Sequence, residues 1–173
     1  VYFSGSDQVW NTGWNKGVIP PLYLSFVPDD KPKYAYASSF GKSKLEEDEL
    51  EEIKKYLSRY NRISVREDSG LKILKEQLNI DNAIRILDPT LIENADFWRK
   101  YAPKNKIKGD YILIYNLNRS KEFDEYAKKL SEKTGYKLYR FCTRIDQMVR
   151  NGKSLIIPEI FEFISLVDNA KIV

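Results

Sequence analysis

The sequence predicts an α/β fold made of Rossmann-like parallel sheets with flanking helices. Short apolar runs of strand length alternate with amphipathic stretches of helix length. Glycine and small polar residues follow several of these runs, as they do where an α/β protein presents a ligand site at the carboxyl ends of its strands. A segment rich in Lys, Pro and Gly at 104–110 interrupts the alternation. We therefore expect two tandem α/β units, 1–103 and 111–173, joined by a linker at 104–110.

In the first unit, strands are predicted at 1–3, 33–38, 62–66 and 83–87, and helices at 45–59 and from 67 onward. The first helix is the clearest, because Leu50, Ile53 and Leu57 form one apolar stripe and acidic residues fill its first turn. We interpret that acidic run as a solvated helix start rather than a metal site. Two prolines predict that Pro20–Phe26 is extended. The order strand, helix, strand, helix, strand is typical of a parallel sheet with crossover helices.

The second unit starts with Tyr111–Tyr115, a strand apolar enough to be central in a sheet. A helix is predicted at 121–133 and a strand at 137–142, followed by a polar loop over 144–154. Pro158 is placed to begin the last helix. A further strand is predicted to start at Lys171.

Composition narrows the classes of function. The net charge of +4 comes from 29 basic and 25 acidic residues that are interspersed, so we expect no nucleic-acid binding. The mild basic balance favours anionic substrates and is compatible with peripheral association at an anionic membrane face. No apolar run reaches the roughly 18 residues of a membrane-spanning helix. The single cysteine, Cys142, suits a cytoplasmic compartment, and we expect it to be a buried structural thiol with no metal site.

Three strand ends of the first unit carry groups that could share a crevice: Gly5–Asp7, Ser38–Gly41 and Val65–Glu67. Carboxyl ends of parallel strands lie at one edge of a sheet. Arg66 is the most informative residue, because a guanidinium binds carboxylate or phosphate bidentately and keeps its charge. The alternative is an ordinary surface ion pair with Glu67 or Asp68.

Other candidates also have two interpretations. Asp7 is either a general base or hydroxyl ligand, or a carboxylate that caps its own turn. Trp10 and Trp14 either form a sugar-stacking wall or pack in the core. Asp88–Thr90 is interpreted as a capped turn. Histidine, the usual acid or base near neutral pH, is absent from the chain. No dinucleotide, P-loop or nucleophile-elbow motif occurs either.

Taken together, these stretches resemble the polysaccharide pyruvyl transferase family. Six pieces occur in the family's order, and the resemblance extends over nearly the whole chain. They are Gly5–Asn11, Tyr36–Gly41, Ile63–Glu67, Leu87–Leu91, Tyr111–Tyr115 and Phe163–Val173. The resemblance implies two Rossmann-like domains facing each other across a cleft, as in GT-B glycosyltransferases. On that basis 1–103 is the C-terminal part of the first domain and 111–173 the N-terminal part of the second, and both are incomplete.

The resemblance also implies a reaction and a site. The reaction transfers pyruvyl from phosphoenolpyruvate to a sugar diol of a cell-surface glycan or lipid-linked saccharide, giving a ketal without a cofactor. Arg66 would bind the phosphate or carboxylate of the donor, and Asp7 would be the polar contact on the acceptor side. These two are the predicted catalytic residues. The predicted substrate-binding residues are Gly5, Ser6, Gln8, Trp10, Asn11, Ser38, Ser39, Phe40, Gly41 and Glu67.

The family's Ser-Phe-His-Gly element would begin just beyond Val173. We therefore expect this chain to be a piece of a longer protein, working in the cytoplasm or at the inner membrane face, and to be inactive by itself. Two other functions stay open: a non-catalytic glycan-binding or scaffold domain, and a GT-B glycosyltransferase that uses a nucleotide sugar. The acceptor sugar, metal dependence and formation of a homo-oligomer are also left open.

Overall fold

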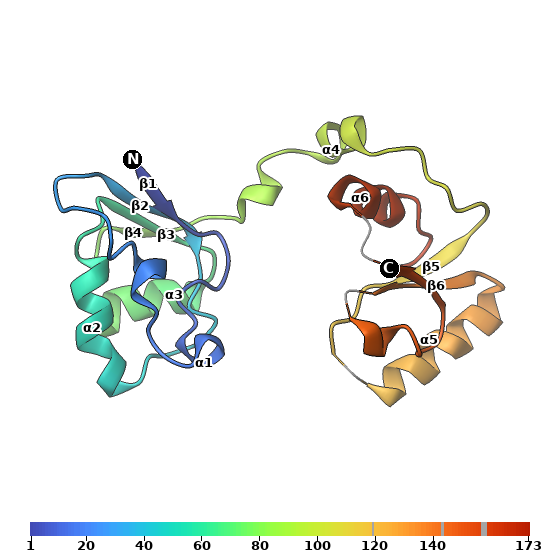
Figure 1. Ribbon diagram of the computed structural model, residues 1–173, viewed down its shortest axis with the longest axis horizontal. Helices are drawn as coiled ribbons and strands as arrows, with labels where there is room; N and C mark the ends of the chain where they lie inside the picture. Colours follow the sequence, from blue (N-terminus) through green and yellow to red (C-terminus); the bar gives the residue numbers. More distant parts are fainter. Residues whose placement is uncertain (119, 143, 157–158) are drawn as a thin grey trace. The chain divides into compact units, whose positions relative to one another are not determined.

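The computed structural model describes residues 1–118, 120–142, 144–156 and 159–173, and the chain divides into two compact units, Val1–Ile92 and Glu93–Val173 (Figure 1). Each unit has its own parallel sheet with helices, which confirms the expected α/β class. The division falls before helix α4 (Ala95–Tyr101), ahead of the segment at 104–110. Helix α4 belongs with the second unit, because Arg99 Nη2 lies 2.7 Å from Asp168 Oδ1 in helix α6 (Ile160–Asp168).

In residues 1–92, all of which are described, four parallel strands form a sheet in the order β1–β2–β3–β4. Their bounds are β1 Tyr2–Ser4, β2 Lys33–Ser38, β3 Arg62–Val65 and β4 Ala83–Arg85. In the register, Phe3 lies opposite Tyr34, and Ile63 lies opposite both Ala35 and Ala83. Because every neighbouring pair is parallel, all the strands end at the same edge of the sheet.

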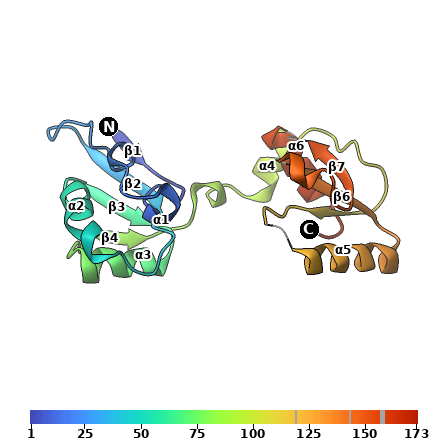
Figure 2. The same cartoon turned by 60° about the horizontal axis from the view of Figure 1, so that its bottom comes forward.

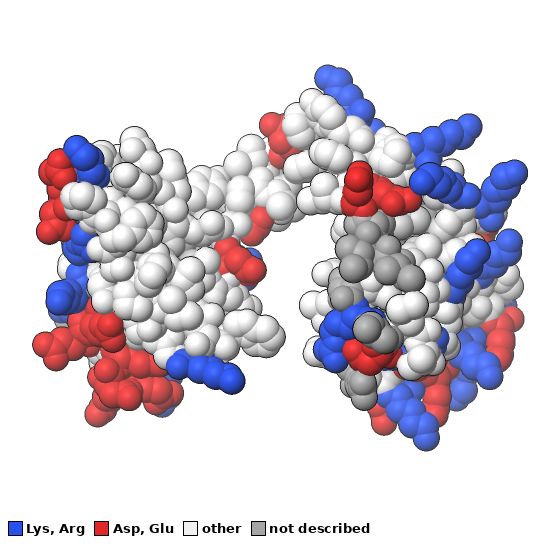
Figure 3. All heavy atoms as spheres, viewed as in Figure 1, with Lys and Arg blue, Asp and Glu red and all other residues white. Residues whose placement is uncertain are grey.

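Helices α2 (Glu47–Leu57) and α3 (Asp68–Lys72, extended by the π-helical turn η2, Ile73–Gln77) cover one face of this sheet (Figure 1). Their apolar side chains, with Ile53 and Leu74 at the centre, are buried against Ile63 and Val65. A capping box of Glu46 and Glu49 starts α2. Acidic side chains gather over α2 in Figure 3, which agrees with the solvated helix start predicted for them.

The prediction that Pro20–Phe26 is extended is wrong. Pro20–Tyr23 forms a 3-10 helix (η1), for which the fixed φ of proline is suited in the first turn. Leu24 follows with a positive φ of 54°, so the chain reverses direction. The reversal packs the Tyr23 ring parallel to that of Trp10, with 5.8 Å between centroids.

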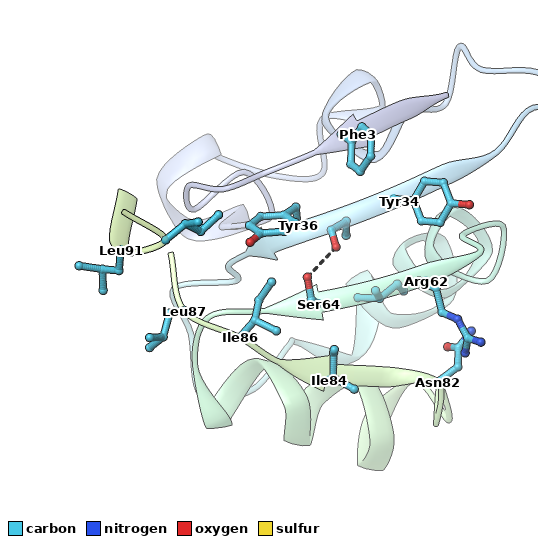
Figure 4. Close-up of a pocket in the computed structure, with 13 residues that line it drawn as sticks. Phe3, Tyr34, Tyr36, Arg62, Ser64, Asn82, Ile84, Ile86, Leu87 and Leu91 are labelled. Carbon is cyan, nitrogen blue, oxygen red and sulfur yellow. Dashed lines mark hydrogen bonds between the residues drawn. The ribbon is translucent and has the colours of Figure 1, made fainter. Parts of the chain in front are cut away.

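Strand β2 contains a bulge close to its carboxyl end. The register with β3 shifts between Ala35 and Ser38, and Ala37 has a positive φ of 49°. The Ser64 hydroxyl accepts a hydrogen bond from Ala37 N at 3.1 Å. It also donates one to Ala35 O at 2.8 Å, and this second bond is the dashed line in Figure 4. One side chain thus satisfies backbone groups that the shifted ladder leaves unpaired. Bulges commonly redirect a strand beside a functional site.

The face of the sheet opposite α2 and α3 is open in residues 1–92. Figure 4 looks onto this face, where Phe3, Tyr34, Tyr36 and Ile84 stand over the strands. With Leu87 and its neighbours they line a cavity of about 900 Å³. Parallel sheets are ordinarily covered on both faces, so this apolar face is a candidate contact surface.

The described residues of the second unit form a parallel sheet in the order β5–β6–β7, lying between helices α5 and α6 (Figures 1 and 2). The bounds are β5 Tyr111–Ile114, α5 Lys121–Thr134, β6 Lys137–Cys142 and β7 Lys153–Ile156. Short 3-10 turns occur at η3 (Pro89–Leu91, first unit) and η4 (Ile145–Gln147). Cys142 is buried, as expected.

Two expectations for the second unit need correction. The loop predicted over 144–154 ends in strand β7, because Leu155 pairs with Phe141 although polar residues precede it. The strand predicted from Lys171 is a single bridge, in which Ile172 pairs with Ile112. Pro158 lies outside the described residues. Within the described part of the chain, no helix combines the length and apolar character needed to cross a bilayer.

Two arginines share one carboxylate at the start of α5. Arg140 Nη2 lies 2.6 Å from Asp124 Oδ1, and Arg150 Nε lies 2.7 Å from Asp124 Oδ2. Arg140 also donates to Asn151 O, and Arg150 to Asn118 O. The Arg140 side chain is only 1% exposed. The cluster therefore ties the segment before β7 to helix α5.

Replacing Ser64 by alanine is predicted to destabilise the first unit by about 1–3 kcal/mol, because the buried Ala37 N–H loses its acceptor. Urea unfolding followed by tryptophan fluorescence measures this. Ser58→Ala is the matched control, since its exposed hydroxyl only bonds Lys55 O of the same helix end, and should change stability by less than about 0.5 kcal/mol. Equal stability of the two variants would contradict this role of Ser64.

Replacing Asp124 by alanine is predicted to cost about 3–5 kcal/mol in the second unit, because two guanidiniums, one of them buried, lose their carboxylate. Thermal unfolding by circular dichroism is the measurement. The neighbouring Glu125→Ala removes only an exposed pair with Lys121 at 3.9 Å and should be nearly neutral. If both substitutions proved equally mild, the cluster would not hold this unit together.

Candidate functional site

The candidate site lies at the carboxyl edge of the first sheet, where four strands end side by side. Strand β1 leads into the loop Gly5–Asn11, and β2 leads into Ser39–Gly41. Arg66 follows β3, and Asp88 follows β4 after two further residues. The predicted convergence of strand ends is therefore present, and it extends to the fourth strand.

Backbone hydrogen bonds join the first two loops. Ser39 N donates to Asp7 O at 3.1 Å, and Trp10 N donates to Ser39 O at 3.1 Å. Arg66 N donates to Ser38 O at 3.3 Å, which connects the third strand end to the same assembly. The position of Asp7 relative to Arg66 is thus fixed by main-chain contacts rather than by side chains alone.

Two glycines allow the loops to approach this closely. Gly5 has a φ of +125°, and a Cβ there would stand 2.9 Å from Ser38 Oγ and overlap Tyr36 O. Gly41 has a φ of +59°, and a Cβ there would overlap the Gln8 side chain. Both positions therefore require glycine for conformation and for space. Gly5 and Gly41 were predicted as substrate-binding residues, and the role that the structure gives them is to let the two loops pack closely.

Arg66 stands among three carboxylates. Its Nη2 lies 3.2 Å from Asp7 Oδ1, its Nη1 lies 3.6 Å from Asp88 Oδ2, and its Nε lies 3.8 Å from Glu67 Oε2. The Asp7 side chain is 87% exposed, whereas those of Arg66, Glu67 and Asp88 are 28%, 28% and 25% exposed. One cation therefore faces an excess of negative charge, and only one of its partners is open to solvent.

The two less exposed carboxylates are held in place from behind. Glu67 Oε1 accepts a hydrogen bond from Phe40 N at 3.2 Å. Asp88 Oδ1 accepts from Thr90 N at 3.0 Å and from Thr90 Oγ1 at 2.8 Å. These two bonds from Thr90 lower the pKa of Asp88, with the Ser6 hydroxyl and the Arg66 charge acting in the same direction. Asp88 is consequently a fixed anion at neutral pH, and the guanidinium is positioned on two sides.

The ion-pair interpretation of Arg66 is confirmed for Glu67, and its role in binding a ligand anion stays a prediction. The ion pair with Glu67 exists, but Asp68 instead pairs with Arg85, whose Nε is 3.2 Å from Asp68 Oδ1. Arg66 also reaches Asp7, which is distant in sequence, and Asp88, at the end of β4. A simple surface pair would not connect three strand ends.

Several residues that were predicted to bind substrate have buried side chains. Trp10 and Phe40 are fully buried in the hydrophobic core, so their side chains support the loops and have no surface for a ligand. Ser38 and Ser39 are buried as well, and their hydroxyls bond Ser4 O and Gly41 N. The core interpretation of Trp10 is therefore the correct one.

The remaining predicted residues lie on the outer side of the loops. Gln8 is exposed and Ser6 and Asn11 are half-buried. Asn11 Nδ2 donates to Gln8 Oε1 at 2.7 Å, and Gln8 N donates to Asp7 Oδ1 at 2.7 Å. Asp7, Gln8 and Asn11 therefore form a connected polar row.

Sequence reasoning missed Asp88 as a neighbour of Arg66. The capped turn predicted for Asp88–Thr90 is confirmed, since Thr90 N–H bonds the Asp88 carboxylate. The available signal was the order of the strands: β4 neighbours β3, so a carboxylate after β4 falls close to a cation after β3. Across the residues that the structure describes, no cluster of three or more His, Cys, Asp or Glu could hold a metal ion.

A comparison with protein families places the whole chain in one of them: the family model described as polysaccharide pyruvyl transferase matches residues 1–173. Neither the curated proteins nor the solved structures that were compared gave a match.

Removal of the Thr90 hydroxyl should raise the pKa of Asp88 towards its ordinary value, because one of the bonds that favour the carboxylate is lost. A pKa lowered by folding stabilises the protein above the unfolded pKa, and this contribution is lost as pH falls through the folded value. As pH falls, Thr90→Val should therefore lose this contribution to stability at a higher pH than the wild type. Carboxyl NMR titration measures the pKa, Thr90→Ser should behave as wild type, and an unchanged pKa in Thr90→Val would refute the assignment.

Proposed function

The chain belongs to the polysaccharide pyruvyl transferase family, and we propose that it takes part in transferring a pyruvyl group from phosphoenolpyruvate to a sugar of a cell-surface glycan or lipid-linked saccharide. The observation that supports the proposal is the meeting of Arg66 with Asp7 at the carboxyl edge of a parallel sheet. This is the edge at which α/β proteins bind ligands. The pair joins a cation suited to an anionic donor with an exposed carboxylate suited to a hydroxyl.

The reaction converts an enol phosphate and a diol into a cyclic ketal and phosphate. The methylene carbon of the donor gains a proton, which makes its C2 electrophilic. One sugar hydroxyl bonds to C2, the C–O bond to phosphate breaks, and the second hydroxyl closes the ketal. Of the two hydroxyl protons released, one balances the proton added to carbon and the other leaves with phosphate. Such a route needs a cationic contact for the donor and a base for the acceptor.

Arg66 is proposed as the cationic contact for the donor, and Asp7 as the base for the acceptor. The phosphate or carboxylate of the donor replaces Asp7 at the outer edge of the guanidinium, because Asp7 is the most exposed of its three partners. The replaced Asp7 carboxylate is then free to accept a hydrogen bond from an acceptor hydroxyl. Glu67 and Asp88 stay in place and keep the guanidinium oriented.

Charge sets a condition on this proposal. With Asp7 displaced, Glu67 and Asp88 still outnumber Arg66, so the guanidinium by itself does not neutralise a trianionic donor. We therefore propose that further cationic groups complete the donor site.

A second candidate function is a glycan-binding domain that performs no chemistry. The observation that favours it is the same excess of carboxylates around Arg66, since carboxylates and amides suit sugar hydroxyls better than a phosphorylated donor. The two functions separate in one assay. A transferase releases phosphate from phosphoenolpyruvate only when an acceptor saccharide is present, and a binding domain releases none.

Replacing Arg66 by alanine is predicted to reduce acceptor-dependent phosphate release by about 100-fold or more, because a positioned cation is removed from the developing charge. The assay uses the protein, phosphoenolpyruvate and a panel of methyl glycosides, with the ketal methyl group followed by NMR. Arg66→Lys should recover little, since an ammonium lacks the bidentate geometry.

Arg85→Ala is the matched control for that substitution, because Arg85 pairs with Asp68 outside the Arg66 cluster. It should leave turnover within a few-fold of the wild type. Normal turnover in Arg66→Ala would remove Arg66 from the site, and a lack of acceptor-dependent phosphate release by the wild type would refute the transferase function.

A further inference from the structure

Trp14 is an exposed aromatic side chain beside the candidate site. We propose that it is the stacking platform for the saccharide acceptor, an inference that rests on the proposed function and names where the sugar ring lies. The sequence leaves Trp10 and Trp14 with the same two interpretations, and the structure separates them. Trp10 is 0% exposed, whereas Trp14 is 83% exposed. Of these two tryptophans, only Trp14 has an aromatic face exposed to a ligand.

The backbone under Trp14 is fixed although its side chain is free. Trp14 lies in helix α1 (Thr12–Asn15), and its N–H donates to Asn11 Oδ1 at 3.0 Å as the N-cap bond. Asn15 Nδ2 donates to Val9 O at 3.2 Å, which ties the same turn back to the loop. The indole is therefore presented from an ordered turn rather than from a loose chain, so little ordering is required when a ligand binds.

A continuous row of hydrogen bonds joins Trp14 to Arg66. Arg66 Nη2 contacts Asp7 Oδ1, to which Gln8 N also donates. Asn11 Nδ2 donates to Gln8 Oε1, and Asn11 Oδ1 accepts from Trp14 N. Each of these contacts is 3.2 Å or shorter. The row belongs to one loop and the turn that follows it, so Trp14 and Asp7 keep a defined separation.

The surroundings of Trp14 match the chemistry of a sugar. A pyranose ring has an apolar face of C–H groups and an edge of hydroxyl groups. An indole can cover the apolar face, while amide and carboxylate side chains bond the hydroxyls. In residues 4–18, all of which are described, Trp14 is the only large apolar side chain among the strongly exposed ones. A protein partner would instead favour a contiguous apolar patch.

NMR of the indole N–H groups of the full 173-residue chain tests the proposal. The chain has three tryptophans, and Trp14→Phe identifies the signal of Trp14 by its loss. The probes are the methyl glycosides of the common hexoses and N-acetylhexosamines. At least one of them should shift the Trp14 signal and leave that of Trp10, which is buried and bonded to Leu22 O, unmoved.

Variants then measure the contribution of the ring. Trp14→Ala should weaken binding of the active glycoside by about tenfold or more, whereas Trp14→Phe, which keeps an aromatic face, should stay within a few-fold. Phe26→Ala is the matched control. Phe26 is also exposed, at 64%, but it packs on Tyr2, at the opposite end of β1 from the site. Its removal should leave binding unchanged.

The outcomes separate this inference from the proposed function. Failure of every glycoside to shift the Trp14 signal, or equal binding by wild type and Trp14→Ala, overturns the platform. In an active preparation, Trp14→Ala should raise KM for the acceptor and leave KM for phosphoenolpyruvate unchanged, and an unchanged acceptor KM also overturns it. Saccharide binding that depends on Trp14 in a protein without phosphate release supports the platform while refuting the transferase.

Discussion

Two backbone hydrogen bonds at Ser39 hold the candidate site together. Through its N–H and its carbonyl, Ser39 binds Asp7 O and Trp10 N, and so joins the loop after β1 to the loop after β2. The joint is protected because Trp10 and Phe40 are fully buried beneath it, with ring centroids 5.1 Å apart. Water has little access to such bonds, and a low local dielectric strengthens them. The main chain that carries Asp7, Gln8 and Asn11 is held by these bonds, so the three residues have defined positions.

Burial distinguishes two arginine clusters that have similar ion-pair contacts. In the second unit, Arg140 and Arg150 share Asp124, and the Arg140 side chain is 1% exposed, so its contacts are structural. In the first unit, one arginine faces three carboxylates, and the Asp7 partner is almost fully exposed. An exposed ion pair is worth little because water competes for both charges. The contact of Arg66 with Asp7 can therefore open at small cost, while the less exposed Glu67 and Asp88 keep the guanidinium oriented.

Sequence reasoning was most successful where periodicity alone decides the structure. The strands around Ala35 and Ile63 and helix α2 occur where they were predicted, because an apolar stripe can be buried in only one way. Convergence of Arg66 with the loop after β1 followed from parallel pairing. Strand β7 was missed because polar residues precede it, and Pro20–Tyr23 was misjudged because the fixed φ of proline suits both extended chain and a 3-10 turn.

The parts that the sequence could not predict depend on contacts between distant residues. Trp10 and Trp14 are chemically identical and four positions apart, yet the distant rings of Tyr23, Phe40 and Tyr60 pack only on Trp10, which is buried. Trp14 has no such partner ring among the aromatic pairs of the described residues, and it remains outside. Trp10 thus stabilises the loop Gly5–Asn11, and Trp14 is exposed on helix α1, which follows that loop. A sugar held against Trp14 would lie along a row of amides that ends at Asp7. The fold that buries one indole therefore also sets the separation of the other from Asp7.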